Sequence, residues 1–165
     1  MTDQVRNELK EGGRAPAFTA TTEGGKQISL KSLKGRYVVL YFYPRDNTPG
    51  CTKEACAFRD AHAGFLKKNA VVLGVSTDSV PSHDRFIEKF NLPFSLLADE
   101  DREIAEAYGV WGEKTFMGRK SMGVRRMTFL IGPSGKILRI WKKVKPVEHA
   151  AEVLEVLDSF DTEGQ

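Results

Sequence analysis

Seven apolar or aromatic residues follow one another from Tyr37 to Tyr43, and this run constrains the fold more than any other feature of the sequence. A strand with one covered face alternates apolar and polar residues, whereas a continuous run is typical of a central strand covered on both faces. Pro44 cannot donate a ladder hydrogen bond, so the strand ends there. We expect a buried sheet, for which 165 residues with 41% hydrophobic side chains are sufficient.

Helices and strands alternate along the rest of the chain. Helical spacing of apolar residues predicts helices over 51–68, 81–90, 104–108 and 147–160. Short apolar runs predict strands over 71–76, 94–97, 127–131 and 136–141, and turn residues predict hairpins at 18–30 and 127–141. This order predicts an α/β fold with parallel first crossovers. It suits a thioredoxin-like core, with a central mixed sheet flanked by helices and an added N-terminal β-hairpin.

One domain accounts for residues 1–165, because no internal repeat or linker divides the chain. Residues 1–13 and 161–165 are expected to be loosely ordered. The stretch 109–125, rich in Gly and Lys, is expected to be irregular. Either it is an ordinary surface excursion, or its aromatic and basic residues contact a partner or a second subunit; these are Trp111, Lys114, Arg119 and Lys120.

The formal charge of +3, from 25 basic and 22 acidic side chains, argues against nucleic acid or an anionic membrane as the main partner. No apolar run approaches the roughly 20 residues that span a bilayer, and the first ten residues lack the hydrophobic stretch of a secretory signal. We therefore expect a cytoplasmic protein. Cellular thiols in the cytosol would keep a permanent bond between Cys51 and Cys56 open, so another purpose is expected for this pair.

The segment from Pro44 to Cys56 lies where the central strand passes into the first long helix. Catalytic groups of open α/β sheets gather at such strand ends. Cys51 falls in the first helical turn, where unpaired backbone N–H groups and the helix dipole favour a thiolate. Thr48 can donate and accept hydrogen bonds, and Pro44 can shield the sulfur from water.

The pattern Pro44-x-x-x-Thr48-x-x-Cys51 resembles the active-site motif of the peroxiredoxins, and residues 43–60 are similar to their bacterioferritin comigratory protein, or Q-type, branch. The similarity continues through 78–79, 92–99 and 126–131, so it covers nearly the whole domain. The resemblance implies a peroxiredoxin variant of the thioredoxin-like fold and a hydroperoxide substrate. It also implies that Cys51 is the peroxidatic cysteine, with Thr48 and Pro44 beside it.

The resemblance further implies an arginine next to the sulfur, and Arg126 is the matching residue, with Arg125 left open as its neighbour. A guanidinium stays charged, so it can stabilise a thiolate and hold peroxide oxygens. Backbone N–H groups of Gly50 and Cys51 are expected to help bind the substrate. Glu54 is expected to orient Arg126, although an acidic residue in a first helical turn is favourable anyway. No cofactor and no metal are expected.

The second cysteine implies movement. Attack on a peroxide gives a sulfenic acid, which another thiol can convert to a disulfide, and Cys56 is the one other cysteine. On one intact helix the two Cα atoms would lie about 8.7 Å apart, beyond the bridging limit of roughly 7 Å. The helix must therefore unwind locally, which agrees with the resolving role that the resemblance implies for Cys56. The alternative is a buried, unreactive Cys56.

The unwinding would expose the disulfide to an external dithiol, for which thioredoxin is the expected reductant. Because the partner thiol is internal, the chemistry does not need a second subunit. A monomer is therefore expected, with a weak dimer left open.

Three other functions fit parts of the sequence. A dithiol reductase of the thioredoxin type would need Cys-x-x-Cys and a proline before Thr128, and the chain has neither. A metal-binding module built on the cysteines and His62 lacks the four ligands that zinc usually takes. We expect His62 in the core, but His83 and His149 on the surface near helix starts. The third alternative is a redox sensor whose unwound helix recruits a partner.

Overall fold

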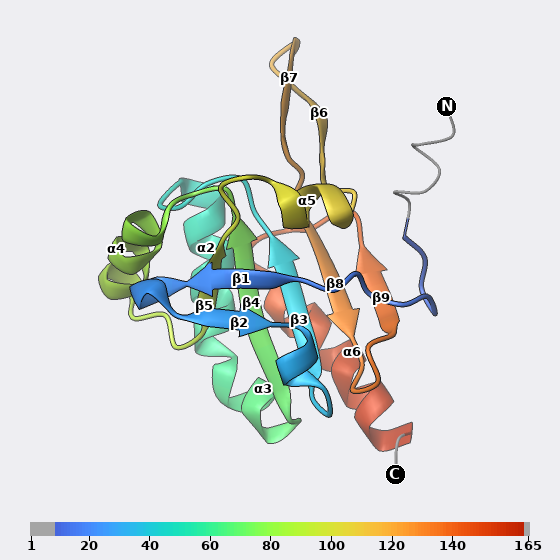
Figure 1. Cartoon of the computed structure of the whole chain (residues 1–165). Helices are drawn as coiled ribbons and strands as arrows, with labels where there is room; N and C mark the ends of the chain where they lie inside the picture. The colour runs from blue at the N-terminus through green and yellow to red at the C-terminus, as the bar shows by residue number, and fades with distance from the viewer. Residues whose placement is uncertain (1–8, 164–165) are drawn as a thin grey trace.

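The structure, a computed structural model, describes residues 9–163 (Figure 1). Within them, seven strands form one sheet in the order β2-β1-β5-β4-β3-β8-β9, and β6 and β7 form a second sheet. The strands are β1 Thr19–Thr22, β2 Gln27–Ser29, β3 Tyr37–Phe42, β4 Ala70–Ser76, β5 Ser95–Ala98, β6 Trp111–Phe116, β7 Arg119–Val124, β8 Met127–Ile131 and β9 Ile137–Trp141. The helices are η1 Glu23–Gly25, η2 Lys31–Leu33, α2 Pro49–Asp60, α3 His62–Lys67, α4 Val80–Phe90, α5 Glu103–Ala107 and α6 His149–Glu163.

Strand β3 is the centre of the larger sheet. It pairs in parallel with β4 and antiparallel with β8, and β4 pairs in parallel with β5. Its alternate residues Val38 and Leu40 belong to the core on one face, whereas Val39 and Tyr41 belong to the core on the other. The predicted central strand with both faces covered is therefore confirmed, as are the parallel first crossovers.

Helices cover the two faces of the sheet unequally. On one face, α2, α3 and α6 lie behind the sheet (Figure 1), and Phe58, Phe65 and Leu157 pack in one core cluster with Tyr41. The opposite face is covered by α5 and by the segment that precedes β1. The N-terminal hairpin joins the sheet because β1 pairs antiparallel with both β2 and β5.

The first long helix is shorter than the expected span of 51–68. Helix α2 ends at Asp60, Ala61 has φ −95° and ψ 2°, and α3 begins at His62 as a separate helix. Cys51 and Cys56 both lie in α2, on the same side of this interruption.

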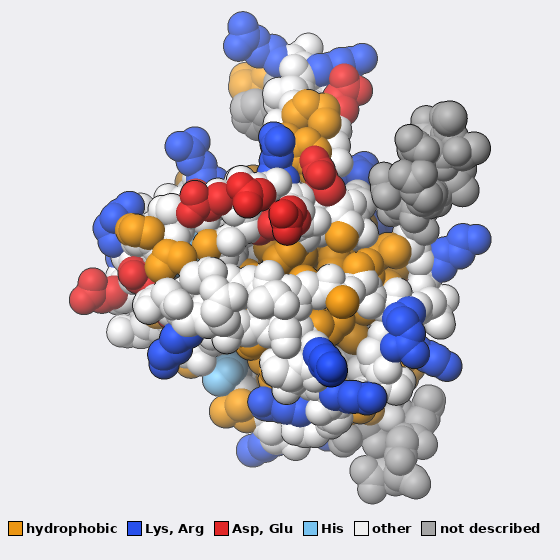
Figure 2. Space-filling model, in the orientation of Figure 1, with side chains coloured by type: hydrophobic (Ala, Val, Ile, Leu, Met, Phe, Trp, Pro, Cys, Tyr) orange, Lys and Arg blue, Asp and Glu red, His pale blue; other side chains and the backbone are white. Residues whose placement is uncertain are grey.

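Residues 109–125 were expected to be irregular, and this expectation is wrong. Strands β6 and β7 pair in continuous antiparallel register from Trp111 with Val124 to Phe116 with Arg119. The turn residues Met117 and Gly118 have φ of 52° and 80°, which suits a two-residue hairpin turn whose twist matches that of the strands. The hairpin projects from the body (Figure 1) and carries Lys and Arg side chains at its end, with Asp and Glu side chains gathered over α5 below (Figure 2).

The chain ends also differ from expectation. Residues 1–8 and 164–165 lie outside the described part. Closer to the sheet, the Gly12 N–H donates to the Ile137 carbonyl at 2.7 Å and the Ile137 N–H donates to the Gly13 carbonyl at 2.8 Å. This part of the lead-in is thus paired with β9 and not loose. Among residues 9–163, no helix is both long and apolar enough to cross a membrane.

Candidate active site

Cys51 lies in the first turn of α2, directly after the loop that follows β3. Thr48 is extended (φ −99°, ψ 158°) and precedes Pro49, whose fixed φ suits the first position of a helix. The backbone bond from the Thr52 N–H to the Thr48 carbonyl, 2.8 Å long, closes the first turn. The N–H groups of Gly50 and Cys51 precede this bond, where helical N–H groups have no acceptor within the helix. Cys51 itself is only 1% exposed.

Arg126, between β7 and β8, contacts the sulfur. Its Nη2 donates to Cys51 Sγ at 3.3 Å, and its Nη1 donates to Glu54 Oε1 at 2.6 Å. Arg125 points elsewhere, because its Nη2 donates to the Gly109 carbonyl at 2.8 Å. Of the two arginines left open by the sequence, Arg126 is therefore the one beside the thiol.

Charge and burial oppose each other around this arginine. Burial lowers the pKa of Arg126, but the negative charges of Cys51 and Glu54 and their hydrogen bonds raise it further, so the net shift is upward. The guanidinium can approach the helix because residue 50 is glycine: a Cβ there would lie 3.2 Å from Arg126 Nη2. Gly50 thus makes room for the contact between Arg126 and α2.

Glu54 is a buried carboxyl with spare bonding capacity. Its side chain is 0% exposed. Burial raises its pKa to about 7, although the charge and hydrogen bond of Arg126 lower it. Within the described part of the chain, Glu54 Oε2 and the Tyr41 hydroxyl are the buried side-chain polar atoms without a hydrogen-bond partner. The pKa of Tyr41 is raised by burial and then by the charges of Glu54 and Cys51, so these groups share one electrostatic environment.

The other residues predicted for the site lie around the same turn. The Thr48 hydroxyl donates to the Arg45 carbonyl at 3.0 Å, which leaves its oxygen lone pairs as acceptors. Pro44 is half-buried at the start of the loop, and Cys56 is half-buried on α2. Both cysteines are free thiols in this structure.

A model of the AhpC/TSA family matches residues 12–140. The chain belongs to the AhpC/TSA family. It is 51% identical over 146 residues to a putative peroxiredoxin bcp of Coxiella burnetii, covering 88% of this chain and 97% of that one. It is 48% identical over 149 residues to peroxiredoxin Bcp of Bacillus subtilis, covering 90% and 95%.

A solved structure gives the same family. The bacterioferritin comigratory protein of Xanthomonas campestris, studied for its alkyl peroxide reduction activity, superposes with a TM-score of 0.83 at 40% identity, covering 87% of this chain and 92% of that one. The predicted membership in the peroxiredoxins and the thioredoxin-like fold in its peroxiredoxin variant are therefore confirmed.

Sequence reasoning did not foresee the position of Lys114 in this AhpC/TSA family member. Lys114 lies on β6, and its Nζ donates to the carbonyl of Val124 at 2.9 Å. Val124 is two residues before Arg126. Burial and the charge of Arg126 lower the pKa of Lys114, whereas the charge of Cys51 raises it. Gly123 leaves the path open, because a Cβ there would lie 3.1 Å from Lys114 Cδ.

The predicted surface positions of His83 and His149 are wrong, because both side chains are 0% exposed. Buried histidines need internal partners, and both have them. His149 Nε2 lies 2.7 Å from Thr128 Oγ1, and His83 Nδ1 lies 2.7 Å from Asp46 Oδ2. Both partners lie far away in the sequence. The one available signal was Asp46, an acidic residue between Pro44 and Thr48, which is the partner of His83.

Two features of the structure concern the alternatives of a dithiol reductase and a metal site built on the cysteines. In residues 9–163 no cis peptide bond precedes Thr128 or any other residue. The described group whose side chains could share a cation consists of Asp46, Asp78 and His83, and neither cysteine belongs to it. Neither observation favours a dithiol reductase or a metal site built on the cysteines.

Proposed function

We propose that this chain is a thiol peroxidase that reduces hydrogen peroxide and organic hydroperoxides to water or alcohols in antioxidant defence. Cys51 acts as the peroxidatic and Cys56 as the resolving cysteine. The observation that carries the proposal is the 3.3 Å contact between Arg126 Nη2 and Cys51 Sγ at the head of α2. A cation that cannot lose its proton stabilises a thiolate without competing for the proton of the substrate.

In the first step the Cys51 thiolate attacks a peroxide oxygen. An S–O bond forms as the O–O bond breaks, and the O–H proton of the hydroperoxide passes to the leaving oxygen, which becomes water or an alcohol; the sulfenate left on Cys51 takes a proton from solvent to become the sulfenic acid. Arg126 is placed to stabilise the charge that moves onto that oxygen. The Thr48 hydroxyl proton is committed to the Arg45 carbonyl, so its oxygen is free to accept from the O–H of a hydroperoxide. The backbone N–H groups of Gly50 and Cys51 supply further hydrogen-bond donors to the substrate. Pro44 shields the sulfur from water, and Glu54 orients Arg126.

In the second step Cys56 attacks the Cys51 sulfenic acid. The new S–S bond releases water, and thiol–disulfide exchange with an external dithiol returns both thiols. The position of both cysteines in one helix supports the expectation that α2 unwinds first.

Thioredoxin is the proposed reductant, and the cytosol is the proposed location because its thiol systems reopen disulfides. The internal partner thiol supports a monomer, with a weak dimer left open. The alkyl peroxide reduction activity named for the Xanthomonas campestris relative supports organic hydroperoxides as substrates.

The test is peroxide titration with disulfide mapping of the wild type, Cys51→Ser and Cys56→Ser. Cys51→Ser should lose all fast peroxide consumption. Cys56→Ser should consume about one equivalent and stop as a trappable sulfenic acid. Fast consumption by Cys51→Ser would overturn the proposal, and continuous turnover of Cys56→Ser with thioredoxin at the wild-type rate would overturn the resolving role, because Cys51 is then the one cysteine left in the chain.

The reductant is tested separately with thioredoxin, thioredoxin reductase and NADPH at low micromolar peroxide. Continuous turnover supports the peroxidase cycle. A single slow oxidation without turnover would favour the redox sensor, and insulin reduction without peroxide would favour a dithiol reductase.

A further inference from the structure

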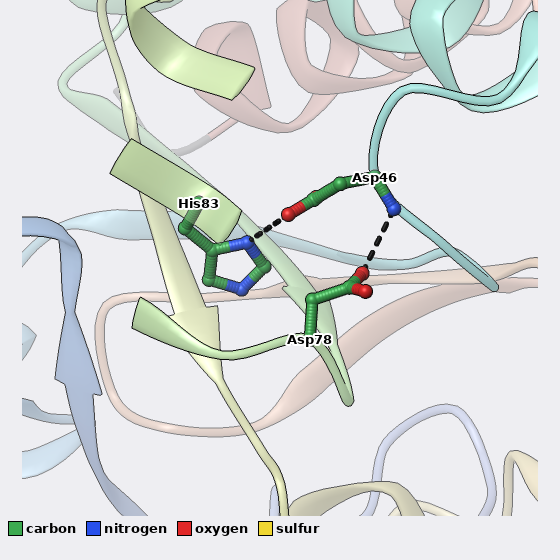
Figure 3. A group of neighbouring side chains, drawn as sticks. All are labelled: Asp46, Asp78 and His83. Atoms are coloured by element: carbon green, nitrogen blue, oxygen red, sulfur yellow. Dashed lines mark hydrogen bonds and ion pairs between the residues drawn. The ribbon is translucent and has the colours of Figure 1, made fainter. Parts of the chain in front are cut away.

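A second pair of buried polar side chains involves the loop that leads to the proposed active site. Asp46 lies on this loop and is 8% exposed, and His83 lies on α4 and is 0% exposed. Figure 3 shows the two side chains pointing toward each other, with Asp78 close to the backbone of Asp46. His83 Nδ1 is 2.7 Å from Asp46 Oδ2.

The hydrogen-bond partners of His83 favour its protonated form. His83 Nδ1 faces the Asp46 carboxylate, and His83 Nε2 faces the Leu97 carbonyl at 2.9 Å. Both partners are acceptors, and a neutral imidazole has only one N–H to donate. The other ring nitrogen would then present its lone pair to an oxygen at hydrogen-bond distance. With Asp46 as a carboxylate, the imidazolium is the form of His83 that satisfies both contacts, and the carboxylate balances its charge.

The electrostatics of the surroundings agree with this assignment. Burial lowers the pKa of His83, but the hydrogen bond and charge of Asp46 raise it, and the Leu97 carbonyl and the charge of Asp78 add to the rise, so that the net shift is upward. The hydroxyls of Tyr43, directly after β3, and of Ser82, on α4, also face the pair.

Asp46 is held through both its side chain and its backbone. Its Oδ1 accepts from the Tyr43 hydroxyl at 2.6 Å, and its Oδ2 accepts from the Ser82 hydroxyl at 2.7 Å in addition to His83. Its N–H donates to Asp78 Oδ2 at 2.8 Å. The loop is therefore tied at this residue to Tyr43 directly after β3, to the segment after β4 and to α4.

This anchor lies close to the chemistry. Asp46 stands between Pro44 and Thr48, and Thr48 begins the turn that contains Cys51. On the basis of the proposed peroxidase function, we propose that His83 and Asp46 are positioning residues: a buried imidazolium–carboxylate pair that fixes the loop 44–50 and thereby places Cys51 against Arg126. Loss of the His83 proton weakens the pair, so the reaction of Cys51 with peroxide slows at alkaline pH.

A shared cation does not account for the same atoms. The ligand atoms of Asp46, Asp78 and His83 lie within 4.8 Å of one another. However, Asp46 Oδ2 and His83 Nδ1 are already bonded to each other, and Asp78 Oδ2 accepts from the Asp46 N–H and from the Ser76 hydroxyl at 2.6 Å. These internal bonds explain why the three side chains converge.

The experiment combines protonation and kinetics. Histidine side-chain NMR of the reduced wild type should show both ring nitrogens of His83 protonated near neutral pH; a bare ring nitrogen would overturn the proposal. The rate of Cys51 oxidation by peroxide is then measured from about pH 6 to about pH 9, a range that extends above the ordinary titration of histidine at about pH 5 to 8. The wild-type rate should fall on the alkaline side together with the His83 titration, and a fall that does not track His83 contradicts the proposal.

Asp46→Asn and His83→Gln should each lower the oxidation rate by roughly tenfold near neutral pH, because a misplacement of about 1 Å can cost up to about 100-fold. Both variants should also lose the alkaline decline of the rate, because the titrating pair is gone. Asp84→Asn, which changes an exposed carboxylate next to His83 that accepts from the Gly24 N–H, is the matched control and should keep the wild-type rate and profile. Rates of Asp46→Asn and His83→Gln equal to that of the control would overturn the proposal.

If either variant fails to fold, the wild-type NMR and pH profile still decide. The outcome for Cys51→Ser is independent, so a failure of the peroxidase assignment is distinguishable from a failure of the positioning role.

Discussion

Two ion pairs lie near Cys51, Asp46 with His83 and Glu54 with Arg126, and they differ in how completely their atoms are bonded. The pair of Asp46 and His83 is saturated: both carboxylate oxygens and both ring nitrogens have partners. The pair of Glu54 and Arg126 is not, because Glu54 Oε2 has no partner among the described residues and Arg126 also contacts a thiol. A saturated network suits holding a loop, whereas unused bonding capacity suits binding a substrate whose charge changes during reaction.

Replacing the Arg126 guanidinium should give the largest effect. Arg126→Lys keeps a charge but loses the planar fork that reaches Cys51 and Glu54 together, so the rate of Cys51 oxidation should fall by about 100-fold to 1000-fold. Stopped-flow measurement with peroxide checks this. Arg125→Lys, at the neighbouring position that contacts the Gly109 carbonyl, is the matched control and should stay near wild type; equal losses in both variants would contradict the assignment.

The pair of Glu54 and Arg126 should also affect how the unfolding free energy depends on pH. Burial raises the pKa of Glu54 from 4.5 to about 7, so the folded state favours the protonated form. The associated stability is present below about pH 4.5 and is lost as pH rises through about 7, a change of about 3 kcal/mol. Relative to Glu54→Gln, the unfolding free energy of the wild type should therefore decrease over this window. Urea titrations across the range check it, and a difference independent of pH would refute it.

Two neighbouring tyrosines sharpen the comparison. The Tyr43 hydroxyl donates to Asp46 at 2.6 Å, but the buried Tyr41 hydroxyl has no partner in the described chain. Tyr43→Phe should cost about 1–3 kcal/mol because it removes a donor from a buried carboxylate. Tyr41→Phe should leave stability unchanged or raise it by up to about 1–3 kcal/mol, because it removes a buried hydroxyl that has no partner among the described residues. Denaturant unfolding of the reduced proteins measures both, and equal costs would erase the proposed distinction.

Gly50→Ala should give the smallest effect, with opposite signs on stability and activity. Alanine favours a helix by up to about 1 kcal/mol over glycine, but the new Cβ would lie 3.2 Å from Arg126 Nη2 and would displace the guanidinium. We expect equal or greater stability with a rate lowered by about threefold to tenfold. Thermal unfolding and single-turnover oxidation of the same sample test this, and an unchanged rate would show that the contact tolerates displacement.

Local patterns predicted β3, the α/β order and the N-terminal hairpin because periodicity and turn residues are properties of short segments. The site depends on longer distances. Arg126 and Cys51 are 75 residues apart, so only the family resemblance pointed to their meeting. His83 was misplaced because its partner Asp46 lies 37 residues earlier, and a polar residue at a helix start indicates the surface unless its partner is visible. The β6–β7 hairpin was missed because β7 is mostly exposed and neither strand alternates apolar and polar residues.

The interruption at Ala61 has a consequence for the proposed disulfide step. A single rod from Cys51 to Lys68 would transmit any distortion at its head to the side chains that pack on β4, including Phe65. Because α2 and α3 are separate helices, α2 can unwind while α3 stays packed against the sheet. The rearrangement thus has a built-in boundary, and most of the buried apolar layer need not open when the two sulfurs meet.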